Sequence, residues 1–487
     1  MKDFRKTKII GTIGPASESE EMLTKLMKAG LNVCRINFSH GGFEENAVKI
    51  QTIKNVREKL GLPIALALDT KGPEIRTGKL ESGDEKVVIH EGQEFTFVKD
   101  DIIGNETKTT ISYKELYKDV KPGTTILVDD GTLEFEVKEV VGTDIVTVAK
   151  NTAKLGSRKT MNIRGVKVNL PALAQKDIDD ITNGVKAGFD YIFASFVRRA
   201  DDVRQIRKLL NDNGGQEIEI ISKIESQEGV DNMDEIIELS DGIMVARGDM
   251  GVEIPLENVP IVQKQLIKKC NEAGKPVIVA TQMLESMQSN PRPTRAETSD
   301  VANAIYDLTS CIMLSGECAM GKYPVECVEV MNKIALAIES DLNYTKRFDC
   351  TRFDHDIVED PRHQAAYNAV ETILNSNADA VACYTRSGRS AEYLSSMRTE
   401  VPVLIITDNE KTYNKMSLIQ GVQVVLVDTK NAVNDMIEDG IAKFESNGIL
   451  EKGDKVVIAG VDSELGNTRK YAAFSGVINI WLVYFVF

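Results

Sequence analysis

The chain has 487 residues, which is too long for one compact core, so two to four domains are expected. Hydrophobic residues make up 42% and charged residues 27% of the sequence, which is the balance of an ordinary globular protein. A net charge of -15 argues against a nucleic-acid binder and against a polybasic membrane binder.

The titratable residues narrow the chemistry further. Seven cysteines, an odd number with no Cys-x-x-Cys pair, indicate reduced thiols, and four histidines without a His-x-x-x-His spacing argue against a zinc site. The first residues show no signal peptide, so a cytoplasmic location is expected. Catalysis must therefore depend on carboxylates, lysine, threonine and a metal.

Eight short β-rich runs, each followed by a segment of helical period, predict the largest part of the fold. The runs are 7–13, 32–37, 64–69, 190–196, 218–224, 242–247, 276–281 and 310–315. Eight strands alternating with helices predict an α/β protein with a (β/α)8 TIM barrel, formed by residues 1–72 and 168–344. In such a barrel the chemistry lies at the C-terminal ends of the strands.

About a hundred residues between the third and fourth runs interrupt this pattern. The alternating stretches in this interval are 85–98, 124–128, 133–141 and 144–149. Turn signals such as Pro122-Gly123 separate them. The interval predicts an inserted all-β lid domain at 73–167 over the barrel mouth, with Gly72 and Pro73 as candidate hinge residues.

A second alternation of helices and strands begins at about residue 345 and predicts a C-terminal three-layer α/β domain over 345–487. The predicted helices are 361–376, 389–398, 410–420 and 430–446, and the predicted strands are 379–384, 402–406, 422–427 and 455–459. The final segment, GVINIWLVYFVF, is too short to span a bilayer and is expected to form a closing buried strand.

Polar side chains occur at the ends of seven successive barrel runs. They are Arg35, Asn37, Ser39, Asp69, Thr70, Lys71, Ser195, Arg198, Lys223, Glu225, Asp249, Thr281, Ser315 and Glu317. Ordinary loops are polar too, so each residue alone is weak evidence. Seven successive strand ends predict a site at one face of the barrel.

The most informative segment is 218–252. Lys223 and Glu225 are two residues apart, so in an extended strand both side chains point the same way, and Asp249 follows the next run. One carboxylate from each strand end, with a lysine beside them, suits a divalent metal and a transferring phosphoryl group. Without Lys223, the better interpretation of Glu225 and Asp249 would be two solvated carboxylates. A structural salt bridge between Lys223 and Glu225 could coexist with the catalytic role.

Long segments of the chain resemble the pyruvate kinase family, from residue 6 to about residue 460. They are TKIIGTIGPAS (7–17), NVCRINFSHG (32–41), LDTKGPEIRTG (68–78), FASFVR (193–198), IISKIE (220–225), DGIMVARGDMGVEIP (241–255), ATQMLESM (280–287) and NPRPTRAETSDVANA (290–304). The resemblance implies transfer of a phosphoryl group from phosphoenolpyruvate to ADP, the last step of glycolysis. It also implies a homotetramer, with neither nucleic acid nor a membrane as partner.

The resemblance assigns the central chemistry. Glu225 and Asp249 would hold Mg2+ (or Mn2+), and Lys223 would stabilise the phosphoryl group in transit. Gly248 and Asp249 would open a short helix whose N–H groups receive the substrate carboxylate. Thr281 would take part in proton delivery to the enolate, together with water. Taken alone, the glycine would be only part of a turn and the threonine a cap.

Further residues are assigned to the substrate and the nucleotide. Arg35 would contact the transferring phosphate, and Ser195 is a second substrate-binding residue. Arg76, Lys159 and His40 are assigned to ADP. Lys159 lies in a basic cluster that would otherwise be a solvated charge run, so its role depends on lid closure.

A monovalent cation is implied beside the divalent one. Asn37, Ser39, Asp69 and Thr70 would supply an all-oxygen cage for K+, and a hydrogen-bonded cluster capping two strands is the alternative. Glu74 matches the residue found in family members that require K+, which predicts activation by K+.

The loop TRSGRSA (385–391) resembles the family loop that holds the phosphate of an allosteric sugar phosphate, and an ordinary helix N-cap is an equal alternative. The residues concerned are Thr385, Ser387, Gly388, Arg389 and Ser390. Many family members finish with a Gly-Thr-Thr-Asn turn, whereas the segment 460–487 departs from that pattern, with Gly466-Asn467-Thr468 as the nearest remnant. Regulation is therefore left open.

Two other functions fit parts of the sequence. Another barrel enzyme acting on phosphoenolpyruvate or an enolate, such as a metal-dependent aldolase, would not need Arg76, Lys159 or the lid. An inactive paralogue that binds a sugar phosphate would be expected to lose the metal carboxylates, the lysine or the threonine, and all are present. The sequence predicts a working kinase.

Overall fold

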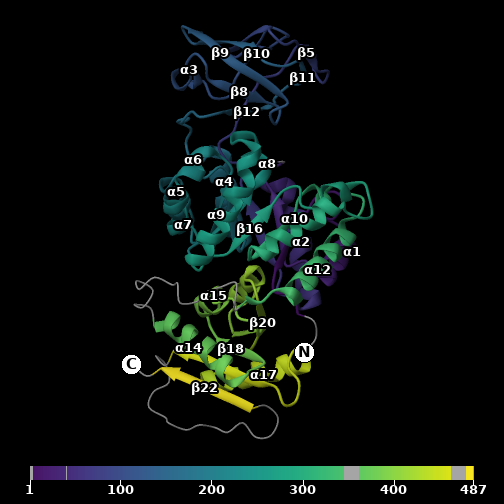
Figure 1. Ribbon diagram of the computed structural model, residues 1–487, viewed down its shortest axis with the longest axis vertical. Helices are drawn as coiled ribbons and strands as arrows, with labels where there is room; N and C mark the ends of the chain where they lie inside the picture. The colour runs from purple at the N-terminus through teal and green to yellow at the C-terminus, as the bar shows by residue number, and fades with distance from the viewer. Residues whose placement is uncertain (1–3, 40, 345–360, 462–478, 486–487) are drawn as a thin grey trace.

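The computed structural model describes residues 4–39, 41–344, 361–461 and 479–485. Figure 1 shows three bodies along the long axis, with a β-rich lid at one end, an α/β barrel in the middle and a second α/β body at the other end. This arrangement agrees with the predicted architecture, while the residue boundaries assigned to the three domains stay predictions.

Eight parallel strands close into the barrel that the sequence predicts. They are β1 Lys8–Thr12, β2 Val33–Asn37, β3 Ala65–Asp69, β13 Tyr191–Ala194, β14 Glu219–Ile224, β15 Gly242–Ala246, β16 Val277–Ala280 and β17 Cys311–Leu314. They follow one another around the barrel in chain order, and β17 pairs with β1 to close it. Every residue of β1, β3, β13, β15, β16 and β17 is buried, which explains their continuous apolar runs.

Helices surround the barrel. They are α1 Glu20–Ala29, α2 Phe43–Leu60, α4 Gln175–Ala187, α5 Ala200–Asp212, α6 Gln227–Asp231, α7 Met233–Leu239, α8 Arg247–Glu253, α9 Val259–Glu272, α10 Arg295–Tyr306, α11 Gly316–Ala319 and α12 Pro324–Asp341, with 3-10 turns at Leu256–Asn258 and Glu285–Gln288. Helix α10 begins with a capping box, in which Thr294 and Glu297 each accept a hydrogen bond from the other's backbone N–H.

The lid is built from β-strands that pair antiparallel, except that β6 and β7 pair parallel. The strands are β4 Ile75–Arg76, β5 Val87–Ile89, β6 Glu94–Val98, β7 Lys108–Thr110, β8 Thr125–Val128, β9 Leu133–Val141, β10 Asp144–Ala149, β11 Ala153–Leu155 and β12 Thr160–Ile163, with helix α3 at Leu116–Asp119. A seven-stranded sheet has the order β4-β12-β8-β9-β10-β6-β7, and β11 pairs with β5. Phe95, Phe97 and Phe135 form its aromatic core, with neighbouring ring centroids 5.3 Å apart. The lid therefore has a hydrophobic core of its own.

The C-terminal body is a five-stranded parallel sheet in the order β20-β19-β18-β21-β22. Its elements are α14 Pro361–Ser376, β18 Ala380–Tyr384, α15 Arg389–Ser396, β19 Val403–Thr407, α16 Glu410–Lys415, a 3-10 turn at Met416–Leu418, β20 Val422–Leu426, α17 Val433–Ser446, β21 Lys455–Val461 and β22 Asn479–Phe485. Strand β22 confirms that the final segment forms a strand. The helix expected over 410–420 is shorter, because it changes into the 3-10 turn.

Side chains of successive residues in this sheet enter two different cores. Ala380, Ala382 and Leu404 pack with α17, whereas Val381 and Val403 pack with α14, α15 and the residues inside the lower barrel. The sheet is thus covered by helices on both faces, as the predicted three-layer arrangement requires.

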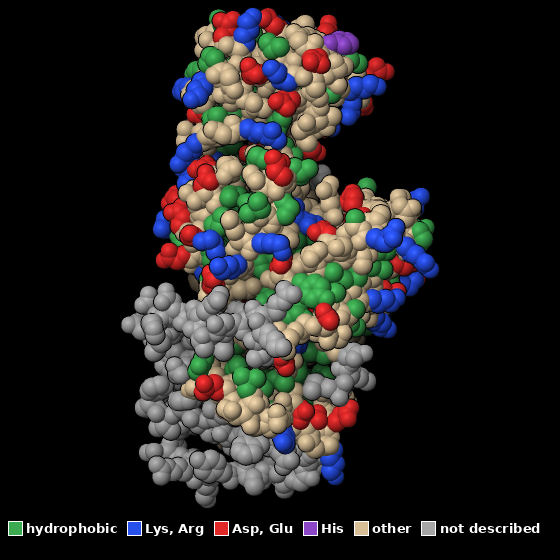
Figure 2. Space-filling model, viewed as in Figure 1, with side chains coloured by type: hydrophobic (Ala, Val, Ile, Leu, Met, Phe, Trp, Pro, Cys, Tyr) green, Lys and Arg blue, Asp and Glu red, His purple; other side chains and the backbone are tan. Residues whose placement is uncertain are grey.

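The surface visible in Figure 2 carries charges of both signs, and the described cysteines are buried. Acidic and basic side chains are intermixed over the face shown in Figure 2, and the molecule is hollowed between the lid and the barrel on one side. Cysteines 34, 270, 311, 318, 327 and 383 are free and buried, while Cys350 lies outside the described residues. None of the helices in the described part of the chain combines the length and apolar character that a membrane crossing needs.

Candidate active site

The strand-end residues form a buried network of charges at one end of the barrel. Arg35 Nε donates to Asp69 Oδ2 at 2.6 Å, and Arg35 Nη1 donates to Thr12 Oγ1 at 2.7 Å. Lys223 Nζ lies 3.2 Å from Asp69 Oδ1 and 3.0 Å from Glu225 Oε1. One aspartate therefore joins the two cations assigned to the phosphoryl group.

The charges in this network stabilise one another. Burial alone would raise the pKa of Asp69, but Arg35 and Lys223 outweigh burial and hold that pKa below its ordinary value. Burial alone would lower the pKa of Lys223, but Asp69 and Glu225 raise it above its ordinary value. Lys223 is thus favoured as a cation by the two carboxylates that it contacts.

Ser195 connects this network to strand β3. Its Oγ accepts a hydrogen bond from Lys223 Nζ at 2.8 Å and donates one to the Thr70 carbonyl at 2.6 Å. Its backbone N–H donates to Thr70 Oγ1 at 3.0 Å. Ser195 therefore fixes the position of the lysine, and its assignment to the substrate stays a prediction.

Glu225 and Asp249 are the candidate metal ligands. Phe196, whose φ of 54° is strained for a non-glycine residue, donates its N–H to Glu225 Oε2 at 2.6 Å. Burial raises the pKa of Glu225 to about 7, with Lys223 opposing that rise and Asp249 adding to it. Two carboxylates that repel one another in a buried site are stabilised by a cation between them.

The donor set fits Mg2+ in one further respect. Among the described residues, no cluster of three or more His, Cys, Asp or Glu side chains is arranged to hold a metal. Magnesium is usually bound by one or two carboxylates and completes its octahedron with water and substrate oxygens, so the pair of Glu225 and Asp249 is sufficient.

Helix α8 brings Gly248 against Thr281. Gly248 N donates to Thr281 Oγ1 at 2.8 Å, and Thr281 Oγ1 donates to the Ala280 carbonyl at 2.6 Å. The predicted short helix is confirmed, and a substrate carboxylate at Gly248 would have to share this N–H with Thr281. Thr281 has a φ of 70°, so its hydroxyl is held by a strained turn at the end of β16.

Arg247 supports that turn and was not predicted as a site residue. Its Nε and Nη2 donate to the carbonyls of Ala280 and Thr281 at 3.1 and 2.6 Å, and Nη1 donates to Asp300 at 2.7 Å. The one sign of this role in the sequence was the Arg-Gly-Asp segment directly after a barrel strand. It could not identify the partners of Arg247, because those partners lie on other elements.

The residues of the predicted K+ cage lie close together. Asn37 and Asp69 are directly paired across β2 and β3, and Thr70 follows Asp69. Strand β2 ends at Asn37 and Ser39 lies in a turn, so Ser39 is not on the strand face that carries Asn37. Ser39 N donates to Asn37 Oδ1 at 3.0 Å, which keeps the serine beside the cluster.

Of the lid residues predicted to bind the nucleotide, Arg76 lies on β4 and Lys159 immediately precedes β12. Pairing of β4 with β12 places Arg76 opposite Thr160, next to Lys159. Arg76 pairs with Glu74 at 2.8 Å and Lys159 with Asp129 at 2.8 Å, so each cation has an acidic partner. His40 lies outside the described residues.

The loop 385–391 has the predicted strand–loop–helix form. Gly388, with a φ of 94°, precedes α15, and its N–H donates to Thr385 Oγ1 at 3.1 Å. A phosphate in this loop would have to share the Gly388 N–H with Thr385, and the ligand stays a prediction. The Gly466-Asn467-Thr468 remnant lies outside the described residues.

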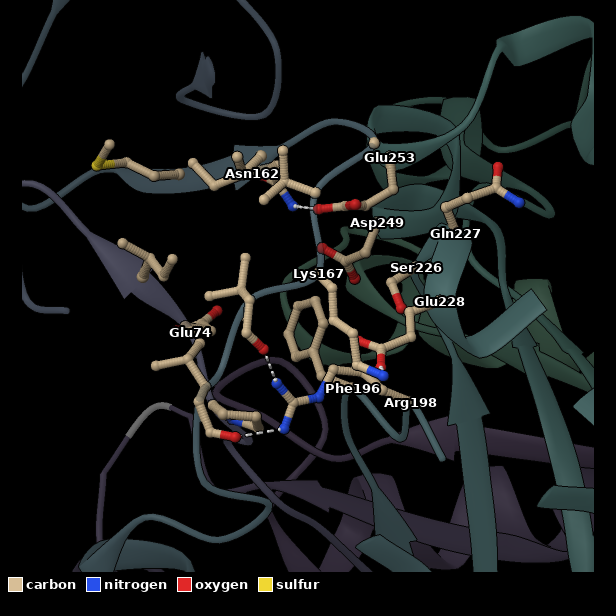
Figure 3. A pocket seen from close by; sticks show the side chains of 18 of the residues that line it. Glu74, Asn162, Lys167, Phe196, Arg198, Ser226, Gln227, Glu228, Asp249 and Glu253 are labelled. Carbon is tan, nitrogen blue, oxygen red and sulfur yellow. Dashed lines mark hydrogen bonds and ion pairs between the residues drawn. The ribbon is translucent and has the colours of Figure 1, made fainter. Parts of the chain in front are cut away.

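A cavity of about 390 Å3 separates the lid from the barrel (Figure 3). Its wall includes Asp249 on α8, Phe196 after β13, and Asn162 and Lys167 from the lid side. Burial raises the pKa of Glu253, also in this wall, to about 7, while a hydrogen bond from Asn162 lowers it and Asp249 raises it.

The first lid hinge is held from the barrel. Gly72 has a φ of 72°, and its N–H donates to Asp177 Oδ1 at 3.1 Å on helix α4. A β-carbon at Gly72 would lie 2.8 Å from the Ser195 β-carbon, so only glycine fits. Asp177 was missed because nothing in its local sequence indicates a contact with residue 72.

Comparisons with known proteins agree with this geometry. Residues 4–328 match the family model described as "Pyruvate kinase, barrel domain", and residues 363–469 match the model "Pyruvate kinase, alpha/beta domain". The chain is 48% identical over 467 residues to a protein of Clostridium acetobutylicum named pyruvate kinase, covering 96% of this chain and 98% of that one.

Relatives of the same name occur in other bacteria. The Bacillus licheniformis protein is 48% identical over 469 residues, covering 96% of this chain and 80% of its own. The Clostridium perfringens protein is 46% identical over 460 residues, covering 94% of this chain and 96% of its own.

Proposed function

The chain belongs to the pyruvate kinase family, and we propose that Lys223, Glu225 and Asp249 are the centre of its phosphoryl transfer. It is a phosphotransferase of glycolysis that forms pyruvate and ATP from phosphoenolpyruvate and ADP. The proposal rests on Lys223, a buried lysine at the barrel mouth that the carboxylates of Asp69 and Glu225 keep cationic.

Phosphoryl transfer needs positioned charge more than covalent participation. Lys223, a point charge with fixed partners, neutralises the charge that spreads over the phosphoryl oxygens in transit. Arg35, oriented by Asp69 and Thr12, contacts the same group. Thr281 holds its hydroxyl beside Gly248 and takes part, with water, in protonating the enolate.

The family generally needs divalent and monovalent cations. We assign Mg2+, or Mn2+ in its place, to Glu225 and Asp249, whose mutual repulsion supports the assignment. When bound, the metal neutralises phosphoryl and enolate oxygens as a Lewis acid. Gly248 N–H and Asp249 lie in the same helical turn, so the substrate carboxylate and the metal would meet there.

We assign the monovalent cation to Asn37, Ser39, Asp69 and Thr70, with K+ as the ion and Glu74 as the residue that makes it necessary. The pairing of Asn37 with Asp69 supports this assignment, because it brings oxygen ligands from two strands to one point. Both carboxylate oxygens of Asp69 already accept hydrogen bonds, so a cation would share them.

The remaining assignments rest on the family. Arg76, Lys159 and His40 would contact ADP when the lid closes, which would require Arg76 and Lys159 to release Glu74 and Asp129. The loop 385–391 would take the phosphate of a sugar phosphate. We further propose a homotetramer working in the cytoplasm.

Pyruvate formation from phosphoenolpyruvate, ADP and Mg2+ tests these assignments, measured with KCl and with tetramethylammonium chloride at the same ionic strength. Activity that requires KCl supports the monovalent cage. Equal activity in both salts would support the kinase activity and contradict the proposed monovalent-cation site. A folded protein with no activity in either salt would contradict the proposed function.

A further inference from the structure

Besides the first hinge, the lid contacts the barrel at two places on opposite sides of the cavity in Figure 3. One contact joins strand β12 to helix α8, and the other joins the lid's second hinge, the segment 166–170, to the residues that follow β13. Each barrel segment also positions one of the two candidate metal carboxylates. The two lid contacts and the two candidate metal carboxylates therefore lie on the same two segments of the barrel.

The contact at α8 consists of two hydrogen bonds. Asn162 Nδ2 donates to Glu253 Oε1 at 2.8 Å, and Arg164 Nε donates to the Val252 carbonyl at 3.0 Å. Glu253 and Asp249 are four residues apart on the same helix, so they are about one turn from each other. A shift of β12 that carried α8 with it would move Asp249.

The contact at the hinge is made by Arg198, whose guanidinium is buried. Its Nη1 and Nη2 donate to the carbonyls of Val168 and Leu170 at 3.1 and 2.8 Å, as the dashed lines in Figure 3 show. Phe196, two residues earlier, donates the N–H that holds Glu225. The hinge is therefore linked to Glu225 through one short, strained loop.

The backbone of Arg198 is itself fixed to the barrel. Its N–H donates to Asp202 Oδ2 at 2.9 Å, and its carbonyl accepts from Asn232 Nδ2 at 2.8 Å. Only the side chain extends to the lid. The Arg198 side chain therefore ties the hinge to a backbone position that the barrel holds, two residues from Phe196.

We propose that Asn162, Glu253 and Arg198 are positioning residues that couple the orientation of the lid to the spacing of the two metal carboxylates. The proposal rests on the assignment of Glu225 and Asp249 as metal ligands. A lid held through both contacts keeps the two carboxylates at the separation the metal needs. By thermodynamic reciprocity, the bound metal in turn favours that lid orientation.

Binding of Mn2+ to the full-length enzyme without substrates tests the coupling, with free Mn2+ measured by electron paramagnetic resonance. Asn162→Ala and Arg198→Lys are each expected to weaken binding by on the order of fivefold or more. Lysine cannot reproduce the two-pronged donation of Arg198, although it keeps the charge. Thermal unfolding of each variant checks that the fold is intact.

Asn151→Ala is the matched control. Asn151 is another lid asparagine with two side-chain hydrogen bonds, donating to the Thr132 carbonyl and accepting from Glu134 N, and both partners belong to the lid. Its loss should leave Mn2+ affinity unchanged. Weakening of equal size in this variant would show a general effect of lid stability and overturn the proposal.

The variant Asp249→Asn tests the metal assignment separately from the coupling between the lid and the metal carboxylates. If Asp249→Asn abolishes Mn2+ binding while Asn162→Ala and Arg198→Lys bind as the wild type does, the coupling is overturned and the metal site stands. If Asp249→Asn binds Mn2+ normally, the metal assignment and the coupling fail together. Hydrogen exchange gives the reciprocal result, since Mn2+ should protect the amides of residues 166–170 in the wild type and not in Asn162→Ala.

Discussion

At the scale of single residues, Asp69 balances the charge at the barrel mouth. It accepts from Arg35 through one oxygen and from Lys223 through the other. Asp69 thus pairs with both buried cations, where an unpaired charge would be costly. A preorganised pair of cations is what a phosphoryl group in transit requires.

Lys223→Met should reduce kcat for pyruvate formation by about 100-fold to 1000-fold or more, because a fixed charge at the developing negative oxygens is lost. The apolar stem of methionine keeps most of the packing, so the protein should stay folded, as circular dichroism can check. Lys264→Met, which breaks an exposed ion pair with Asp307 on the barrel surface, is the control and should keep full activity. Unchanged turnover in Lys223→Met would remove Lys223 from the mechanism.

Sequence spacing could predict the neighbourhood of Lys223 and Glu225, since residues two apart share one side of a strand. It could not predict that Asp69 is a partner of Lys223, because the two are 154 residues apart and meet only when the barrel closes. Arg247 and Glu253 were missed for the same reason, as their partners Ala280 and Asn162 lie on distant elements.

At the scale of elements, helix α8 combines several tasks in seven residues. It carries the proposed metal ligand Asp249, places Gly248 against Thr281, and receives the lid at Glu253. The first hinge is equally constrained, because Gly72 packs against Ser195, which in turn holds Lys223. Lid attachment and catalysis therefore share the same short segments.

Gly72→Ala should lower kcat by about tenfold to 100-fold, because a displaced Ser195 moves Lys223 from its position. The added β-carbon would lie 2.8 Å from the Ser195 β-carbon and 2.9 Å from its carbonyl oxygen. Steady-state kinetics measures the effect directly.

Gly142→Ala is the control for Gly72→Ala. Gly142 has a φ of 64° in the lid, and a β-carbon there would meet nothing within 4 Å. Both variants carry the backbone strain of alanine at positive φ, about 1–2 kcal/mol, but only Gly72→Ala should lose activity. Equal kcat in the two variants would contradict the role given to the hinge.

The elements that the sequence predicted well are the barrel strands, whose apolar runs are buried on both faces. The lid strands β4, β7, β11 and β12 were not foreseen, because runs of two to four residues carry no clear alternation. Their pairing depends on strands far along the chain, such as β4 with β12.

At the scale of the whole molecule, the barrel and the C-terminal body share one hydrophobic core. Apolar side chains inside the lower barrel pack in the same cluster as those of α14 and α15. Tyr191 OH donates to the Lys415 carbonyl at 2.9 Å, and Lys415 forms an ion pair with Glu219. The sequence predicted both bodies but gave no signal of this junction, since each half of it is an ordinary apolar face.

Glu392 makes this junction sensitive to pH. Burial raises its pKa to about 8, Glu219 and Asp241 add to that rise, and Lys415 and Arg389 oppose it. A carboxyl whose pKa is raised in the folded state contributes most below its ordinary pKa of 4.5 and loses that contribution as pH rises towards 8. Glu392→Gln should therefore have about the wild-type Tm near pH 5 and a higher Tm than the wild type at pH 8.5.

Thermal unfolding of both proteins at the two pH values measures this difference. A Tm difference that is the same at pH 5 and pH 8.5 would show that the Glu392 carboxyl keeps its ordinary pKa in the folded protein.

The role of Glu225 as a metal ligand in phosphoryl transfer is tested most directly by titrating Mg2+ in the wild type and in Glu225→Gln. The measured quantity is the rate of pyruvate formation from phosphoenolpyruvate and ADP. Glutamine keeps the size of the side chain and an acceptor for Phe196 N–H, while it removes the negative charge and turns an amide NH2 group toward Lys223. We predict a saturable dependence on Mg2+ in the wild type and a loss of about 100-fold or more in the variant. A variant with the wild-type rate and the wild-type dependence on Mg2+ would contradict the account.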